Sequence, residues 1–227
     1  MFLRTIRLFF LLVLSSGFFF CTPANGQNKD AGLWTSLNFE AKLVKKLSFN
    51  LSQEFRFNEN ITELGTLFTD AGLEYKLNKH FRVAADYRFI KKRSVDNFYI
   101  ARHRLYADLK YEIKFKPIQM QIRTRLSNSA EFSRSSEGGD LEYYLRNKLS
   151  LKWDLEKPFT PYFSVELFSP LNYPRYSVFD NIRSVAGIEY DFSKHHKIDV
   201  FYMIQKEMNV SDPETDFVVG LGYFYKL

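Results

Sequence analysis

The chain has 227 residues, of which 45% are hydrophobic and 26% are charged, so neither an intrinsically disordered protein nor a bundle of transmembrane helices fits it. Its 32 Lys and Arg residues stand among 26 Asp and Glu residues, and this mixed charge argues against nucleic acid as a partner. The aromatic share is 18%, with 24 Phe and 14 Tyr, which favours extended strands over helices.

The first 26 residues have the pattern of a cleaved signal peptide. Arg4 and Arg7 form a positive n-region, and residues 8–20 form an apolar stretch that is shorter than the roughly 20 residues of a membrane-spanning helix. Small residues just before Gln27 predict cleavage there, so we expect an exported mature chain, residues 27–227. A lipid-anchored lipoprotein is the alternative, which the three Phe residues before the chain's only cysteine disfavour.

After the signal peptide, apolar and polar side chains alternate with a period of two, which is typical of β-strands with one apolar face. Nothing between the alternating segments indicates a helix, and short turns alternate with longer polar connections. Eleven segments follow one another at roughly 31–43, 47–58, 66–77, 81–91, 98–115, 118–128, 141–155, 159–168, 181–192, 197–207 and 216–227.

Strands of this kind fit either a soluble β-domain with an apolar core or a membrane barrel with an apolar outer surface. Three features favour the membrane barrel: segments that mostly run 10 to 15 residues, the alternation of short and long connections, and aromatic residues beside the short turns. Those aromatic residues are Tyr75, Phe81, Tyr111, Phe115, Trp153, Phe159, Tyr190 and Phe192. A secreted soluble β-domain that binds an apolar ligand stays as the alternative.

The predicted fold is all-β, an antiparallel up-and-down transmembrane β-barrel of about 10–12 strands. Bacterial single-chain barrels have an even number of strands. With eleven strands and a periplasmic C-terminus, the first strand would begin outside the cell. We therefore prefer twelve strands slightly, and expect either that one segment is not a barrel strand or that the long segment 98–115 is misread.

The C-terminal residues resemble the signal that the outer-membrane barrel assembly machinery reads. Gly222 is followed by Tyr225 and Leu227, two apolar residues separated by one position at the end of the chain. The resemblance departs from the usual pattern because the chain ends in Leu rather than Phe. It implies two partners, the assembly machinery during biogenesis and outer-membrane lipid afterwards, in a Gram-negative cell.

The mature chain also resembles an uncharacterised outer-membrane family, domain of unknown function 2490. The matching marks are the segments 30–34 (DAGLW), 53–57 (QEFRF) and 102–105 (RHRL), in this order. The resemblance implies a β-barrel and nothing about an activity.

The polar faces of the segments carry charges of both signs, which a barrel would turn toward its lumen. Because an unpaired buried charge is costly, we expect these charges to pair across strands and fill the interior. The expected lumen network consists of Glu54, Arg56, Arg82, Asp86, Arg88, Arg102, Arg104, Asp108, Arg123, Arg125 and Arg146. A pore that attracts small anionic solutes is the alternative function.

A lipid-active enzyme is the least favoured function. His103 and Asn128 share the predicted lipid-facing side of neighbouring segments, but no serine nucleophile lies nearby on that side. The adjacent His195 and His196 sit at a predicted turn, where a solvated surface is a simpler explanation than a metal site. We therefore expect no catalytic residue, no cofactor and no metal, and the sequence leaves the oligomeric state open.

Overall fold

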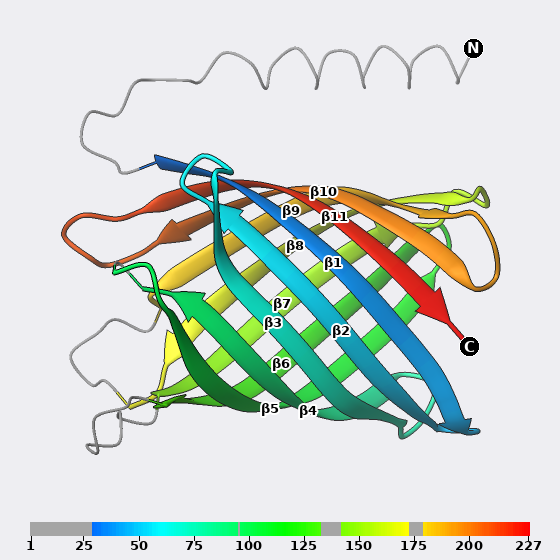
Figure 1. The fold of residues 1–227 in the computed structure, drawn as a ribbon. Coiled ribbons are helices and arrows are strands. Elements are labelled where there is room, and N and C mark those ends of the chain that lie inside the picture. Colours follow the sequence, from blue (N-terminus) through cyan, green and yellow to red (C-terminus); the bar gives the residue numbers. More distant parts are fainter. Residues whose placement is uncertain (1–28, 95, 133–141, 173–178) are drawn as a thin grey trace, which may run out of the picture.

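The computed structural model describes residues 29–94, 96–132, 142–172 and 179–227. The predicted signal peptide lies outside them. They form eleven strands (Figure 1): β1 (Lys29–Val44), β2 (Leu47–Asn58), β3 (Glu63–Lys76), β4 (Phe81–Arg93), β5 (Tyr99–Phe115), β6 (Ile118–Phe132), β7 (Glu142–Trp153), β8 (Phe159–Pro170), β9 (Asn181–Asp191), β10 (His196–Glu207) and β11 (Thr215–Lys226). Among the described residues, no helix has the length and apolar character to cross a membrane.

The strands form one closed barrel in which each strand pairs antiparallel with the next one along the chain. The barrel closes through a parallel pair, β1 with β11, which Figure 1 shows as blue and red ribbons running in the same direction. The parallel register runs from Lys29 opposite Thr215 to Glu40 opposite Lys226. The all-β barrel prediction is therefore confirmed, with a mixed rather than wholly antiparallel sheet.

The preference for twelve strands is wrong, because the described residues form eleven. Each of the eleven predicted segments corresponds to one strand, and segment 98–115 is the single strand β5. The even-number rule assumes that the first and last strands meet antiparallel. A parallel pair makes its own ladder of backbone hydrogen bonds, so an odd number of strands also leaves no unpaired sheet edge.

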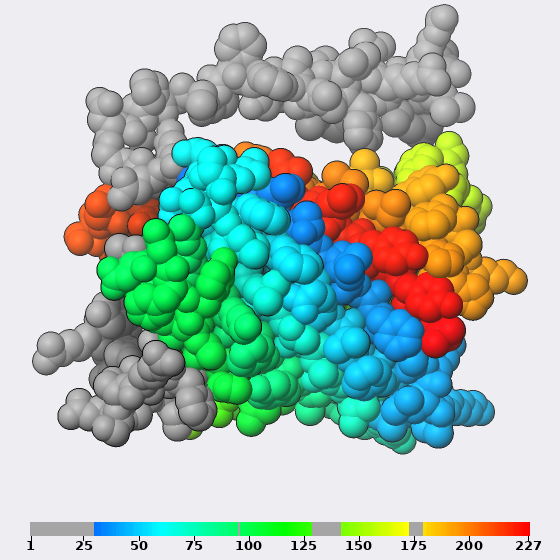
Figure 2. Space-filling model, viewed as in Figure 1, coloured from blue at the N-terminus to red at the C-terminus, as the bar shows by residue number. Residues whose placement is uncertain are grey.

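Alternate side chains along each strand point to opposite surfaces of the barrel. In β5, Leu105 and Leu109 are 58% and 48% exposed, whereas Tyr106 and Asp108 are 8% and 4% exposed. The apolar face therefore points outward and the polar face inward. Figure 2 shows that side chains make a continuous wall over β1, β2 and β11 on the side in view.

Aromatic side chains on the outer surface gather at the end of the barrel that carries the short turns. Tyr75, Phe115 and Tyr190 are all more than 40% exposed there. Phe81 and Tyr111 lie side by side on β4 and β5, with ring centroids 5.0 Å apart. This arrangement is the one that an interfacial aromatic girdle requires.

Glycines on the inner surface make room for aromatic rings from neighbouring strands. A Cβ atom at Gly220 in β11 would lie 1.9 Å from Phe201 Cζ in β10. A Cβ atom at Gly187 in β9 would lie 2.7 Å from the ring of Tyr162 in β8. The absent side chains allow these rings to lie flat against the wall instead of crossing the lumen.

Candidate functional site

A cavity of about 490 Å³ lies inside the barrel and takes lining residues from all eleven strands. Most of its lining side chains are polar or charged. Its cationic residues are Arg56, Arg88, Arg104, Lys110, Arg123, Arg125, Arg146, Lys148 and Arg183, and its anionic residues are Glu54, Asp70, Asp86, Asp108, Glu166 and Asp199. The wall of this cavity therefore carries nine cations and six anions.

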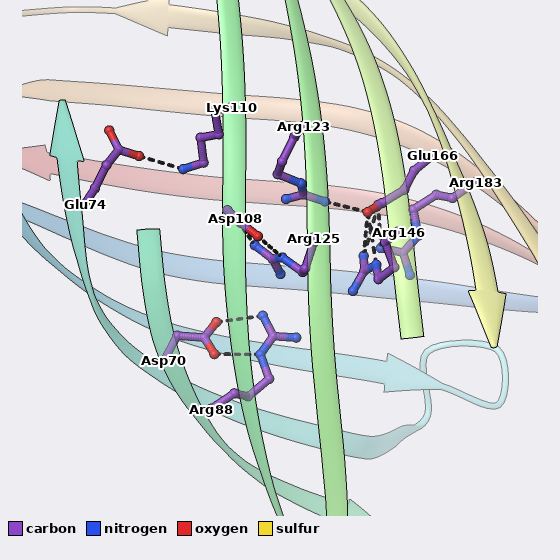
Figure 3. Close-up of polar contacts among 10 residues, drawn as sticks. All are labelled: Asp70, Glu74, Arg88, Asp108, Lys110, Arg123, Arg125, Arg146, Glu166 and Arg183. Carbon is purple, nitrogen blue, oxygen red and sulfur yellow. Dashed lines mark hydrogen bonds and ion pairs between the residues drawn. The ribbon is translucent and has the colours of Figure 1, made fainter. Parts of the chain in front are cut away.

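Two aspartates form two-pronged ion pairs with arginines of the adjacent strand (Figure 3). Arg88 Nε and Nη2 in β4 donate to the two carboxylate oxygens of Asp70 in β3, both at 2.6 Å. Arg125 in β6 donates to Asp108 in β5 at 2.6 and 2.8 Å. This geometry fixes both guanidinium planes, so each pair holds its two strands in register.

Glu166 in β8 is shared by three arginines from three strands (Figure 3). Arg146 in β7 donates to both carboxylate oxygens of Glu166, each at 3.0 Å. Arg123 in β6 donates to the same carboxylate, and Arg183 Nη1 in β9 lies 3.9 Å from Glu166 Oε2. A single buried anion thus lies at the centre of a cationic patch on β6 to β9.

Arg56 and four of the arginines described above lie over aromatic rings that face the lumen. Arg56 Cζ lies 3.4 Å from the ring centroid of Trp34, and Arg125 Cζ lies 3.8 Å from that of Tyr106. Further contacts of this kind join Arg56 and Arg88 to Phe68, Arg146 to Phe168, and Arg183 to both Phe168 and Trp34. We call this set of arginines and rings the arginine–aromatic belt. Its members come from β1 to β9, so it encircles most of the lumen.

Ion pairs continue toward the short-turn end of the lumen. Lys110 Nζ donates to Glu74 at 2.6 Å, and Arg82 Nη1 lies 3.5 Å from Glu112. On the other side of the barrel, Lys152 Nζ in β7 donates to Glu189 in β9 at 2.7 Å. These pairs are more exposed than those at the centre.

A second cavity of about 680 Å³ lies at the long-loop end and shares Arg104, Arg146 and Phe168 with the central cavity. Asp180, just before β9, lines this outer cavity. Burial raises the pKa of the Asp180 carboxyl above its ordinary value, although a hydrogen bond from Tyr144 opposes the rise. Because they share these three lining residues, the two cavities are neighbours.

The structure places nine of the eleven residues expected in the lumen network on the wall of the central cavity, leaving Arg82 nearer the short turns and Arg102 nearer the long loops. Asp86 and Arg104 form no ion pair within the described ranges. The sequence interpretation omitted Glu166, Arg183 and Lys148 from the network. Each of the three stands on the polar face of a recognised segment, and that periodicity was the signal that could have found them.

His103 lies on the outer surface of β5, where its Nδ1 atom is hydrogen-bonded to the hydroxyl of Tyr87 in β4. Asn128 in β6 is opposite Leu105 rather than His103, and its side-chain oxygen accepts a hydrogen bond from Leu105 N at 3.2 Å. His196 Nδ1 lies 2.6 Å from the hydroxyl of Tyr223. No cluster of three potential metal ligands occurs in the part of the chain that the structure describes.

The three residues of the expected assembly signal lie along the seam between β11 and β1. Gly222 is opposite Ser36, and Tyr225 is opposite Phe39, with ring centroids 6.0 Å apart. Leu227 N donates to Glu40 O at 2.9 Å. The end of the chain is therefore bonded to the first strand.

Known proteins resemble this chain in sequence pattern and in fold. The family described as "Protein of unknown function (DUF2490)" matches residues 31–216. A NanC porin structure matches with a TM-score of 0.56 and 15% identity, covering 87% of this chain and 98% of the porin. The beta domain of the Bordetella autotransporter BrkA matches with a TM-score of 0.53 and 10% identity, covering 81% of this chain and 85% of that domain. No curated protein sequence matches the chain.

Proposed function

The chain belongs to the DUF2490 family, and we propose that it is a non-enzymatic outer-membrane β-barrel of a Gram-negative bacterium whose narrow lumen is held closed by ion pairs. The outward apolar side chains and the aromatic girdle beside the short turns support a lipid environment. Strands of 11 to 17 residues are long enough to cross a bilayer at a tilt. The barrel likeness to the NanC porin and the BrkA beta domain supports the same location.

The observation that carries the narrow-lumen proposal is the combination of ion pairs and stacked rings at one level of the barrel. Arg88 and Arg125 are each held by a carboxylate on one side and lie over an aromatic ring on the other. A guanidinium restrained in both ways does not move aside at low cost. The arginine–aromatic belt therefore acts as a fixed constriction, and the protein contributes structure to the membrane rather than an open water-filled channel.

Planar-bilayer recording of the refolded mature chain, residues 27–227, tests this proposal. We expect a conductance far below that of an open barrel of similar strand number. Replacing Asp70 and Arg88 together with alanine removes one ion pair without leaving a lone charge, and should raise the conductance. A wild-type conductance as high as that of an open barrel of similar strand number would contradict the closed lumen.

A pore for small anionic solutes is the second candidate function, and the excess of cations on the cavity wall favours it. The same recordings distinguish the two functions. Under a gradient of sodium chloride, an anion-selective pore gives a reversal potential close to the equilibrium potential of chloride. A structural barrel gives no stable current, so no reversal potential can be measured.

Location and biogenesis need separate tests. We propose that residues 1–26 direct export, and that outer-membrane lipid and the barrel assembly machinery are the partners of the mature chain. Cell fractionation, combined with gel migration before and after boiling, tests both points, since folded barrels migrate anomalously until they are heated. A mature chain that stays in the supernatant after ultracentrifugation without detergent would instead indicate a soluble β-domain.

A further inference from the structure

The cationic patch around Glu166 has more positive charge than its single carboxylate balances. Arg123, Arg146 and Arg183 approach the Glu166 carboxylate, and Lys148 is its register partner on β7. Four cations thus share one anion on the wall of the central cavity, as Figure 3 shows for the three arginines.

Several donors in this patch have no acceptor. Lys148 Nζ has no carboxylate within 4.0 Å in the described chain, although Lys148 lines the cavity. The Nε atom of Arg123 and the hydroxyl of Ser164 are buried without a hydrogen-bond partner among the described residues, and Ser164 is only 2% exposed. Ser164 is two residues before Glu166 on the same inward face of β8, so these unsatisfied donors line one side of one cavity.

Buried like charges and unsatisfied hydrogen-bond donors lower the stability of the folded barrel. Each unpaired cation away from bulk water is disfavoured, and like charges packed together repel one another. Several other cations in the lumen meet this problem with a carboxylate: Lys110 pairs with Glu74, Arg88 with Asp70 and Arg125 with Asp108. No second carboxylate serves this purpose beside Lys148 within the described residues.

We infer that the patch formed by Arg123, Arg146, Lys148 and Arg183, with Ser164, is a binding site for a small oxyanion of the phosphate or carboxylate class. Guanidinium groups donate paired hydrogen bonds to the oxygens of either group, and an ammonium group adds a point charge. The cavity of about 490 Å³ has room for an ion of a few non-hydrogen atoms. The patch faces the lumen, so a soluble anion is the ligand rather than a lipid headgroup. This inference does not depend on whether the barrel conducts.

Thermal unfolding of the refolded mature chain in detergent tests the site. Samples in sodium chloride, sodium phosphate and sodium citrate are compared at one ionic strength and pH. We expect Tm to rise with phosphate, with citrate or with both, and to saturate as the concentration increases. The anion that acts at the lower concentration identifies the class. Equal Tm values in all three salts would overturn the inference.

Two lysines on the same face of β7 provide a matched pair of variants. Lys148→Gln removes one excess charge from the patch, so it should raise Tm in chloride and reduce the apparent affinity for the anion at least tenfold. Lys152 lies four residues further along β7, outside the cavity, and Lys152→Gln removes its hydrogen bond to Glu189. It should lower Tm in chloride and leave the anion affinity unchanged. Equal anion affinity in both variants would overturn the assignment to this patch, and the wild-type titration stands even where a variant fails to refold.

Discussion

Leu109 and Lys110 are consecutive residues of β5 that face opposite surfaces of the barrel. The Leu109 side chain is 48% exposed on the outer surface. Lys110 Nζ reaches into the lumen and donates to Glu74 at 2.6 Å. A single step along the chain therefore moves from the apolar outer wall to the charged lumen, and this contrast gives a direct test of which face contacts lipid.

Replacing Leu109 with arginine should impair folding into liposomes. An arginine on the lipid face near the middle of the membrane costs about 2–4 kcal/mol, a large part of a typical stability of about 5–15 kcal/mol. Lys110→Gln should cost much less, because the lumen accepts polar side chains. Urea unfolding in liposomes measures both variants.

A soluble β-domain would also be harmed by Leu109→Arg, so a second measurement is needed. Single cysteines at positions 109 and 110, each labelled with a fluorophore, are compared in bilayers that contain a lipid-soluble quencher. We expect quenching at 109 and not at 110. The reverse pattern, or no quenching at either position, would contradict the assignment of faces.

The Asp70–Arg88 pair predicts a strong effect of removing one charge. Asp70→Asn leaves the Arg88 guanidinium without its buried anionic partner and should lower the free energy of unfolding by about 3–5 kcal/mol. Asp70→Asn combined with Arg88→Gln removes both charges and should recover much of that loss. Denaturant unfolding of the refolded chains measures each value, and a single variant as stable as wild type would show that the pair contributes little.

The parallel seam predicts which cysteines cross-link. Thr35 in β1 is opposite Leu221 in β11, and neighbouring strands lie about 4.7–4.9 Å apart, within the range of a disulfide. Oxidation should therefore join cysteines at these two positions in the refolded mature chain, which has no native cysteine. A control pair at Thr35 and Val219 is displaced by two residues and should not join. In a twelve-stranded barrel, β1 and β11 would not be neighbours. Neither cysteine pair would then form a disulfide, and a non-reducing gel would show no cross-linked band.

Deleting the chain after Thr215 should stop membrane insertion. The deletion removes the partner of both β10 and β1, and it removes Gly222, Tyr225 and Leu227. Two open sheet edges in lipid would leave many backbone groups without hydrogen bonds. The measurement is the amount of heat-modifiable protein in the outer-membrane fraction. Normal accumulation of the shortened chain would rule out a role of these residues in assembly.

The strands could be predicted from the sequence because their signal is local. Alternation of apolar and polar residues depends only on the strand's own geometry, so segment 98–115 and β5 coincide almost completely. The direction of the closing pair could not be predicted, because Lys29 and Thr215 are far apart in the chain and alternation looks the same in either direction. The rule of even strand numbers, which holds for barrels that close antiparallel, therefore led to the wrong preference for twelve strands.

The composition of the lumen could be predicted better than its pairings. Parity places Arg123, Arg125 and Arg146 on inward faces, and that is a property of each strand alone. Which carboxylate each one meets depends on how far adjacent strands are staggered, as Arg123 shows by contacting Glu166 two strands away. Stagger is fixed by closure of the whole barrel, so the shared role of Glu166 is visible only in the folded structure.

The parallel β1–β11 seam also restricts how the chain could be rearranged. In a barrel that closes antiparallel, a short turn could join the last strand to the first and give a circular permutant. Here the register aligns twelve residue pairs in the same direction, so such a connection would have to run back along the barrel for about 40 Å at about 3.3 Å per residue. A linker of a few residues cannot do this, and permutants of this barrel require a connection of a dozen residues or more.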